Sequence, residues 1–146
     1  DKANDLPPLM RFESHYNEQS MLNTSPVFSW YVAGLVFEWI IEKGGLDAMS
    51  ELNATKASLI YNYIDNSILY QNHVNPEYRS WVNIPFTMTQ DGLEEKFLKM
   101  SSEVGFKNLK GHRTVGGMRA SVYNAMPIKA ITELIAFMET FENQNL

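Results

Sequence analysis

An apolar segment, PVFSWYVAGLVFEWIIEK at residues 26–43, limits how this chain can fold more than any other feature. Ser25-Pro26 is a typical helix start and Gly44-Gly45 a typical stop, so we predict one helix between them with Ser25 as its N-cap. This helix is apolar on nearly every side. Three residues interrupt it, namely Ser29, Glu38 and Glu42. Because no uninterrupted stretch reaches the ~18 residues of a membrane span, we expect the helix to be buried between domains or subunits.

The composition excludes several classes of protein. With 146 residues, the chain is long enough for one ordinary domain and too short for two comfortable ones. It has no cysteine, which excludes disulfides and thiolate metal sites, and its three histidines lack the spacing of metal ligands. The formal net charge of −5 argues against nucleic-acid binding. Because the N-terminus has no signal-peptide pattern, we expect a cytoplasmic protein that does not enter the membrane.

Hydrophobic periodicity predicts the remaining elements. We expect residues 1–25 to be irregular or extended, because Pro7-Pro8 block a helix. The later elements are helices at about 46–66, around 93–100 and from Pro127 onward, and strands at 82–88 and 118–123. Pro85 suggests that the first of these strands is an edge or contains a bulge. The predicted class is α/β, with helices packed on a small mixed or antiparallel sheet and a long apolar helix before them.

A basic segment near the C-terminus is the strongest candidate for a binding site. From Val104 to Thr132 the chain has no Asp or Glu, although the chain as a whole is acidic. Five cations lie in this segment: Lys107, Lys110, Arg113, Arg119 and Lys129. The planar fork of arginine suits a carboxylate or a phosphate, and each charge-assisted hydrogen bond contributes about 1.5–3 kcal/mol. The segment therefore indicates an anion site.

The arrangement within this segment predicts two anion subsites. Strand alternation directs Arg119 to the face opposite the apolar side chains. The Gly116-Gly117 pair allows the backbone to come close to a ligand or to another segment. We predict one subsite at His112 and Arg113 and another at Arg119. The alternative is that these arginines pair with acids distant in the sequence and that the two glycines form an ordinary turn.

A second candidate site precedes the apolar helix. Asn23 and Thr24 lie just before its N-terminus, where free backbone N–H groups and the positive end of the helix dipole favour phosphate. The alternative is ordinary capping by Ser25, with Asn23 and Thr24 as turn formers. We interpret His15 and His73 as solvent-exposed. The tryptophans are interpreted as core or interface residues: Trp30, Trp39 and Trp81.

Two motifs resemble those of a known enzyme family. GHRTVGGMRASVYNAMP, residues 111–127, is similar to the C-terminal signature of the phosphoserine aminotransferases, Gly-His-Arg-x-Val-Gly-Gly-Met-Arg-Ala-Ser-Ile-Tyr-Asn-Ala. SMLNTSPVFSWYVAGLVFEWI, residues 20–40, resembles that family's segment Met-x-Asn-Thr-Pro-Pro-Thr-Phe and the apolar helix after it. The resemblance covers essentially the whole chain from about residue 20. The sequence departs from the pattern at three places: Ser25 (usually Pro), Val27 (often Thr) and Trp81 (smaller or basic).

The resemblance implies a fold-type-I, class-V enzyme that depends on pyridoxal 5'-phosphate. Such enzymes transfer the amino group of glutamate to 3-phosphohydroxypyruvate, giving 2-oxoglutarate and O-phosphoserine, for serine biosynthesis and in many bacteria pyridoxine biosynthesis. They are homodimers with active sites at the subunit interface. By position, the resemblance implies that Asn23 and Thr24 reach the cofactor phosphate in the partner subunit's site. It implies that Arg119 holds the substrate α-carboxylate and that His112 and Arg113 help to cradle the substrate phosphate.

The resemblance also implies that this chain is the C-terminal part of such an enzyme. The family's Schiff-base lysine, the Asp that pairs with the pyridine nitrogen and the aromatic residue on the ring are expected upstream of Asp1. We therefore expect no catalytic residue in the chain and no transamination by the chain alone. The implied organisation has a tail of the large cofactor-binding domain at 1–25, an interdomain or interface helix at 26–45 and the small C-terminal domain at 46–146.

Two alternatives stay open at this point. In the first, the chain is a freestanding anion-binding or dimerisation module without catalysis. In the second, it belongs to a related class-V aminotransferase with another substrate. The His112-Arg113 pair argues against the second, because a substrate without phosphate does not need it. In the absence of its partners, the helix at 26–43 exposes a large apolar patch, and we expect the chain to associate through that patch.

Overall fold

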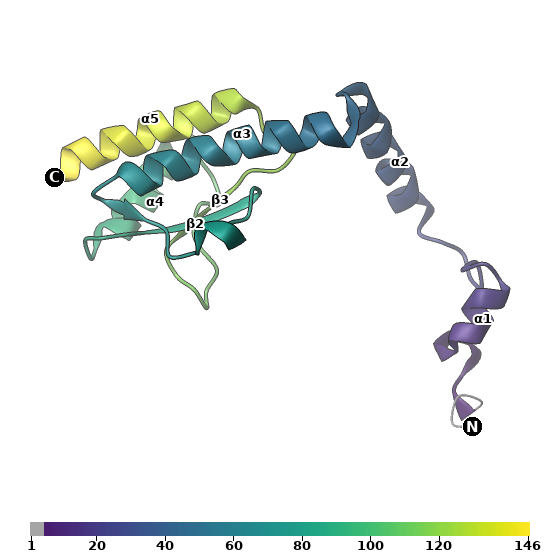
Figure 1. The fold of residues 1–146 in the computed structure, drawn as a ribbon. Helices are drawn as coiled ribbons and strands as arrows, with labels where there is room; N and C mark the ends of the chain where they lie inside the picture. Colours follow the sequence, from purple (N-terminus) through teal and green to yellow (C-terminus); the bar gives the residue numbers. More distant parts are fainter. Residues whose placement is uncertain (1–4) are drawn as a thin grey trace. The chain divides into compact units, whose positions relative to one another are not determined.

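The computed structural model of the chain describes residues 5–146. The chain divides into two compact units, Asp1–Lys43 and Gly44–Leu146 (Figure 1). The first unit contains a 3-10 helix, η2 (Pro8–Met10), and a short helix, α1 (Phe12–Asn17). The expectation of an irregular segment is therefore wrong for these residues. A proline in the first turn has no N–H group to leave unpaired, so it starts η2 instead of preventing it.

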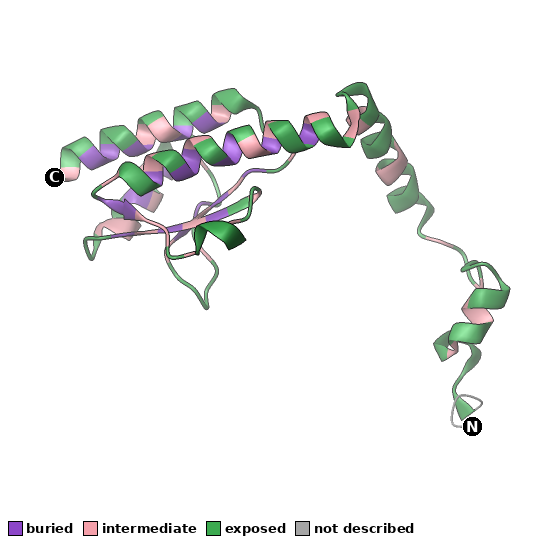
Figure 2. Cartoon of the chain, in the orientation of Figure 1, coloured by how far each residue is buried: buried purple, intermediate pink, exposed green. Residues whose placement is uncertain are grey.

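The long helix of the first unit, α2 (Val27–Glu42), is mostly exposed. The predicted N-cap is wrong, because Pro26 takes that position and the Ser25 hydroxyl donates instead to the Met21 sulfur (3.0 Å). None of the residues of α2 is buried, and Phe28 is 79% exposed (Figure 2). Among the helices of residues 5–146, none is long and apolar enough to cross a membrane.

The second unit is a small antiparallel sheet with helices packed on one face. In chain order its elements are α3 (Gly45–Asn66), β1 (Tyr70–Gln71), η3 (Pro76–Tyr78), β2 (Asn83–Met88), α4 (Leu93–Glu103), β3 (Met118–Ser121) and α5 (Ile128–Asn145). The three strands are ordered β1-β2-β3, and α3 and α5 lie side by side (Figure 1). This arrangement confirms the predicted α/β class. The short strand β1 was not predicted.

Alternation along β2 and β3 separates a buried face from an open face. Ile84 and Phe86 pair directly with Ala120 and Met118, and all four side chains are at most 2% exposed. They join a core to which α3, α4 and α5 contribute. The residues between them, Arg119 included, point away from this core and are only partly buried, as the alternation predicts.

Pro85 is tolerated in the middle strand because that strand is paired on only one side at this position. The pairing of β1 with β2 reaches only Thr87 and Met88, whereas β3 pairs with Asn83–Phe86. The side chain of Asn72 donates a hydrogen bond to the Pro85 carbonyl. The strand is therefore locally an edge at Pro85, as predicted.

An aromatic cluster joins the sheet to the last two helices. Phe97 of α4 lies edge-on to Phe141 of α5, with ring centroids 5.2 Å apart, and edge-on to Phe86 of β2 at 6.1 Å. Tyr70 of β1 completes the cluster at 5.9 Å from Phe97. Such edge-to-face pairs add about 0.5–1.5 kcal/mol each beyond the burial of their area. The core therefore depends on aromatic residues that lie far apart in the sequence of the second unit, from Tyr70 to Phe141.

A buried carboxylate, Glu142 of α5, closes the turn between α3 and β1. It accepts hydrogen bonds from the hydroxyls of Tyr63 and Ser67 (2.7 Å each). It also accepts bonds from the backbone N–H groups of Ile68 (3.0 Å) and Leu69 (3.1 Å). Burial by itself would raise the pKa of Glu142, but the hydrogen bonds outweigh burial and lower that pKa below its ordinary value. The ionised carboxylate therefore stabilises the folded state.

The folded state lowers the pKa of Glu142. The ionised carboxylate therefore stabilises the folded state fully above the ordinary pKa of 4.5, and this stabilisation is lost as the pH falls through the lower pKa of the folded state. We expect Glu142→Gln to lower the free energy of unfolding at neutral pH by about 1–3 kcal/mol and to flatten its decline in acid. Urea unfolding from about pH 7 to about pH 3 measures both effects. The exposed Glu139→Gln is the matched control, and an undiminished acid decline in Glu142→Gln would contradict this role.

Candidate anion-binding site

The basic segment folds into a hairpin that leads into β3. Its two arms are joined by backbone hydrogen bonds from Arg119 to Leu109 (2.7 Å) and from Gly111 to Gly117 (2.8 Å). The tip between them, residues 112–116, is closed by two further backbone hydrogen bonds. In Figure 1 this loop extends from the sheet on the side away from α3 and α5. We call residues 109–119 the basic hairpin.

Glycines are required where the basic hairpin approaches other backbone. A Cβ atom added at Gly111 would lie 2.1 Å from the carbonyl oxygen of Gly116. Gly117 has φ +61°, and a Cβ atom there would lie 2.7 Å from both the Phe86 carbonyl oxygen and the Thr87 methyl carbon. Gly116 also has a positive φ but open space around it. The close approach expected for the glycine pair therefore exists at Gly117, and the neighbouring segment is β2.

The guanidinium group of Arg119 has no hydrogen-bond or ion-pair partner among residues 5–146. Its Nε atom is buried and makes no hydrogen bond in the described part of the chain. The ion pairs that residues 5–146 form with one another join Arg79 to Asp65 and Lys129 to Glu133. The alternative that Arg119 pairs with a carboxylate distant in the sequence is therefore wrong for the described residues. A buried donor without a partner costs about 1–3 kcal/mol, which an anionic ligand would recover.

His112 and Arg113 lie at the tip of the basic hairpin and are exposed. Nδ1 of His112 lies 2.8 Å from the Thr114 hydroxyl, which orients the ring within the loop and leaves Nε2 without a partner in the described chain. Arg113 forms neither of the two ion pairs. The structure thus carries the three predicted residues on one hairpin, with Arg119 at its foot and the other two at its tip. No hydrogen bond among the described residues joins the tip side chains to Arg119.

Asn23 and Thr24 belong to the first unit and line an open hollow of about 540 Å³ in front of α2. The first turn of α2 has no acidic residue and no side-chain cap. The predicted alternative, capping by the Ser25 side chain, is therefore wrong. The Val27 N–H donates to the Ser25 carbonyl (2.8 Å), which leaves the N–H groups of Phe28 and Ser29 available to an anion. The amide of Asn23 makes only a weak contact with the Thr24 carbonyl (3.5 Å). These donors fit a phosphate group.

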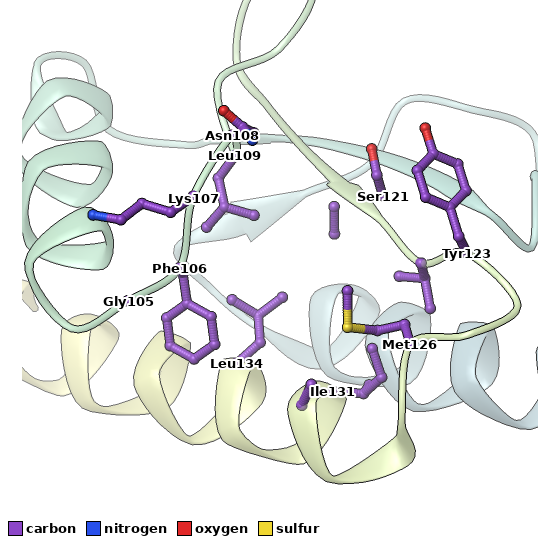
Figure 3. A pocket seen from close by; sticks show the side chains of 13 residues that line it. Gly105, Phe106, Lys107, Asn108, Leu109, Ser121, Tyr123, Met126, Ile131 and Leu134 are labelled. Atoms are coloured by element: carbon purple, nitrogen blue, oxygen red, sulfur yellow. The ribbon is translucent and has the colours of Figure 1, made fainter.

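A separate pocket of about 500 Å³ lies between segment 105–109, β3 and the start of α5. Most of its lining is apolar, and Leu134, Ile131 and Met126 face into it (Figure 3). Lys107 turns away, because its ammonium group donates to the carbonyl (2.6 Å) and the hydroxyl (2.9 Å) of Ser102. The pocket therefore offers no free cation among its lining residues and does not belong to the predicted anion site.

Two polar residues that α3 buries, Asn53 and Lys56, were not among the predicted functional residues. Both contact the turn that follows β3. Their spacing was an available signal, because they fall on the helical stripe of Met49 and Ile60.

The expectations for the histidines outside the basic hairpin and for the tryptophans have mixed outcomes. His73 is exposed as expected, whereas His15 is half-buried, and none of the three tryptophans is buried among the described residues.

Comparison with known proteins identifies the class. Residues 10–134 match the family described as Aminotransferase class-V, and the chain belongs to this family. Two relatives have a name more specific than that of the family, phosphoserine aminotransferase. The chain is 48% identical over 143 residues to the phosphoserine aminotransferase of Hahella chejuensis and 49% identical over 139 residues to that of Pseudomonas fluorescens. These matches cover 98% and 95% of the chain but only 40% and 38% of the relatives, so the chain spans about two fifths of their length.

Solved structures agree with this assignment of the family. The chain matches phosphoserine aminotransferase from Bacillus circulans subsp. alkalophilus with a TM-score of 0.92 and 42% identity, over 98% of the chain and 40% of that protein. It also matches pyridoxal-phosphate-bound phosphoserine aminotransferase from Trichomonas vaginalis with a TM-score of 0.84 and 38% identity, over 92% of the chain and 39% of that protein. The fold of this chain is thus that of a part of these enzymes.

The two adjacent glycines provide a matched test of the basic hairpin. We expect Gly116→Ala to lower the free energy of unfolding by about 1 kcal/mol, because only the left-handed backbone opposes a side chain there. Gly117→Ala should cost at least roughly twice as much, because its methyl group also meets β2. Thermal or urea unfolding of the two variants measures the difference. Equal losses would show that the packing of Gly117 against β2 is unimportant.

Proposed function

We propose that this chain is the C-terminal portion of a phosphoserine aminotransferase, which transfers the amino group of glutamate to 3-phosphohydroxypyruvate and yields 2-oxoglutarate and O-phosphoserine. Membership of the class-V family and the close relatives support this proposal. The observation that carries it is the basic hairpin, whose arginines have no carboxylate partner among the described residues. The reaction would serve serine biosynthesis in the cytoplasm, and the enzyme would act as a homodimer.

In this proposal Arg119 binds the α-carboxylate that both substrates share. Its guanidinium group is partly buried at the foot of the hairpin, so it loses little water and little freedom when the carboxylate binds. A bidentate pair fixes the direction of the carboxylate as well as its position. His112 and Arg113 bind the phosphate at the other end of the phosphorylated substrate. Their exposure at a loop tip suits a group that arrives from solvent.

Binding both ends of the substrate would fix the α-carbon between them. Positioning of this kind supplies several kcal/mol toward the barrier, about 7 or more in good cases. It also gives specificity, because a keto acid without phosphate would leave the hydrogen-bond donors of His112 and Arg113 without a partner. The side chains of this chain therefore bind and orient the substrate, and none of them is assigned a proton transfer.

Asn23 and Thr24 would hold the phosphate of pyridoxal 5'-phosphate, together with the uncapped first turn of α2, in the site of the partner subunit. When bound, the cofactor supplies an electron-withdrawing ring that stabilises negative charge at the substrate α-carbon. We place the lysine that bonds to the cofactor in a part of the protein outside this chain. On this proposal, residues 1–146 alone do not transaminate.

Arg113→Ala in the full-length protein that carries this chain tests the phosphate subsite. We expect KM for 3-phosphohydroxypyruvate to rise about 10-fold or more, since a charge-assisted hydrogen bond contributes about 1.5–3 kcal/mol. KM for glutamate should change little, because glutamate has no phosphate. Steady-state kinetics with each substrate varied in turn measures both constants. Equal increases for the two substrates would contradict the assignment.

Arg119→Lys tests the carboxylate subsite in the same protein. Lysine keeps the charge but lacks the bidentate fork, so we expect both half-reactions to lose roughly 10- to 100-fold in kcat/KM. Single-turnover measurements with glutamate and with 3-phosphohydroxypyruvate separate the two halves. A loss confined to one substrate would exclude a group that binds the feature common to both.

A further inference from the structure

A buried ammonium group ties α3 to the turn that follows β3. Lys56 is 0% exposed, and its Nζ atom donates hydrogen bonds to the carbonyl oxygens of Tyr123 (3.0 Å), Asn124 (3.3 Å) and Met126 (3.2 Å). Neither of the ion pairs within the described chain includes Lys56. Burial lowers the pKa of Lys56, since no carboxylate offsets the loss of water. The three carbonyls match the three donors of an ammonium group.

This arrangement is more than a way to fill space in the core. An isolated charge is costly to bury, and an apolar side chain of similar length would fill the volume without that penalty. What lysine adds is a fixed position for three carbonyl groups of one turn, those of Tyr123, Asn124 and Met126. Asn53, one turn earlier on α3, adds a hydrogen bond from its amide to the side-chain oxygen of Asn124 (2.8 Å). Both side chains of α3 therefore act on the same turn.

The turn held by Lys56 follows β3 almost directly. The backbone of Val122 makes the bond to Val82 (2.6 Å) that follows the last residue of β3, and Tyr123 comes next. At the other end, the basic hairpin holds β3 through the bond from Arg119 to Leu109 (2.7 Å). A strand of four residues has little stiffness of its own, so its position depends on its pairing with β2 and on both attachments. Arg119 is the second residue of this strand.

We propose that Lys56 is a positioning residue for Arg119: by holding the turn 123–126 it fixes the C-terminal end of β3 and thereby the place of the guanidinium group that binds the substrate carboxylate. This inference rests on the proposed function. It assigns no contact between Lys56 and the substrate. Its effect reaches the substrate only through β3.

The experiment uses the full-length protein with Lys56→Ala, which removes the ammonium group and leaves the carbonyls unpaired. We expect KM for glutamate and for 3-phosphohydroxypyruvate to rise together, by about 10-fold, because a small displacement of a binding group is enough for such a loss. Propylammonium replaces the deleted atoms, so adding it should restore a large part of the affinity. The same amine should not change the wild-type constants.

Glu142→Gln is the control for a general loss of stability. Glu142 also is a buried charge that binds a turn, but it lies 14 residues beyond the start of α5, or about 20 Å along the helix. Its variant should unfold more easily and keep both KM values. If Lys56→Ala does not accumulate as folded protein, Asn53→Ala takes its place, with an expected rise of about 3-fold in both KM values.

The outcomes separate this inference from the proposed function. Unchanged KM values in Lys56→Ala, or in its substitute, would overturn the positioning role even if the melting temperature falls. A rise that propylammonium does not reverse would also overturn it, because the loss would then not depend on the ammonium group. Absence of transamination in the wild-type protein would overturn the proposed function, and this inference with it. Wild-type activity with unaffected variants overturns this inference alone.

Discussion

The guanidinium group of Arg119 has no counterion within the described part of the chain, and several features of the second unit keep it unpaired. Strand alternation turns the side chain away from the core, while the glycines of the basic hairpin allow β3 to lie tightly against β2. The absence of acidic residues from 104 to 132 leaves no near neighbour in sequence to neutralise it. A protein that keeps a buried donor unsatisfied maintains a cost in stability, which is typical of a ligand site.

Helices and strands with a regular apolar stripe were predictable from the sequence, and so was α2 from the prolines and glycines at its ends; β1 and the short helices before residue 20 were not. The helices α3, α4 and α5 and the strands β2 and β3 each bury a regular stripe, so periodicity identified them. Strand β1 has two residues and therefore no alternation to detect. The short helices before residue 20 bury nothing and are held by local backbone bonds. Apolar patterning carries no information about such segments.

Some residues of the candidate site were likewise predictable from the sequence, and others were not. Its cations could be found by counting, because an acid-free segment with two arginines is visible in a linear sequence. The apolar stripe of α3 could indicate that Lys56 is buried, but it could not indicate what Lys56 binds, since its partners are three carbonyl groups 67 to 70 residues away. Lysine is also among the residues least often fully buried, so its ordinary interpretation is a surface position. The prediction that Ser25 caps α2 was wrong because its hydroxyl donates to the nearby sulfur of Met21, a contact that a sequence pattern does not reveal.

The aromatic cluster has a consequence for when the second unit can fold. Phe141 and Met138 of the last helix complete a core that begins with Ala57 and Ile60 of α3. Contacts between segments so far apart form late, because the intervening loop must first be closed. During synthesis, α3 and the strands therefore leave the ribosome without their cover. We expect the unit to complete its core only when α5 has emerged, because its apolar stripe stays exposed until then.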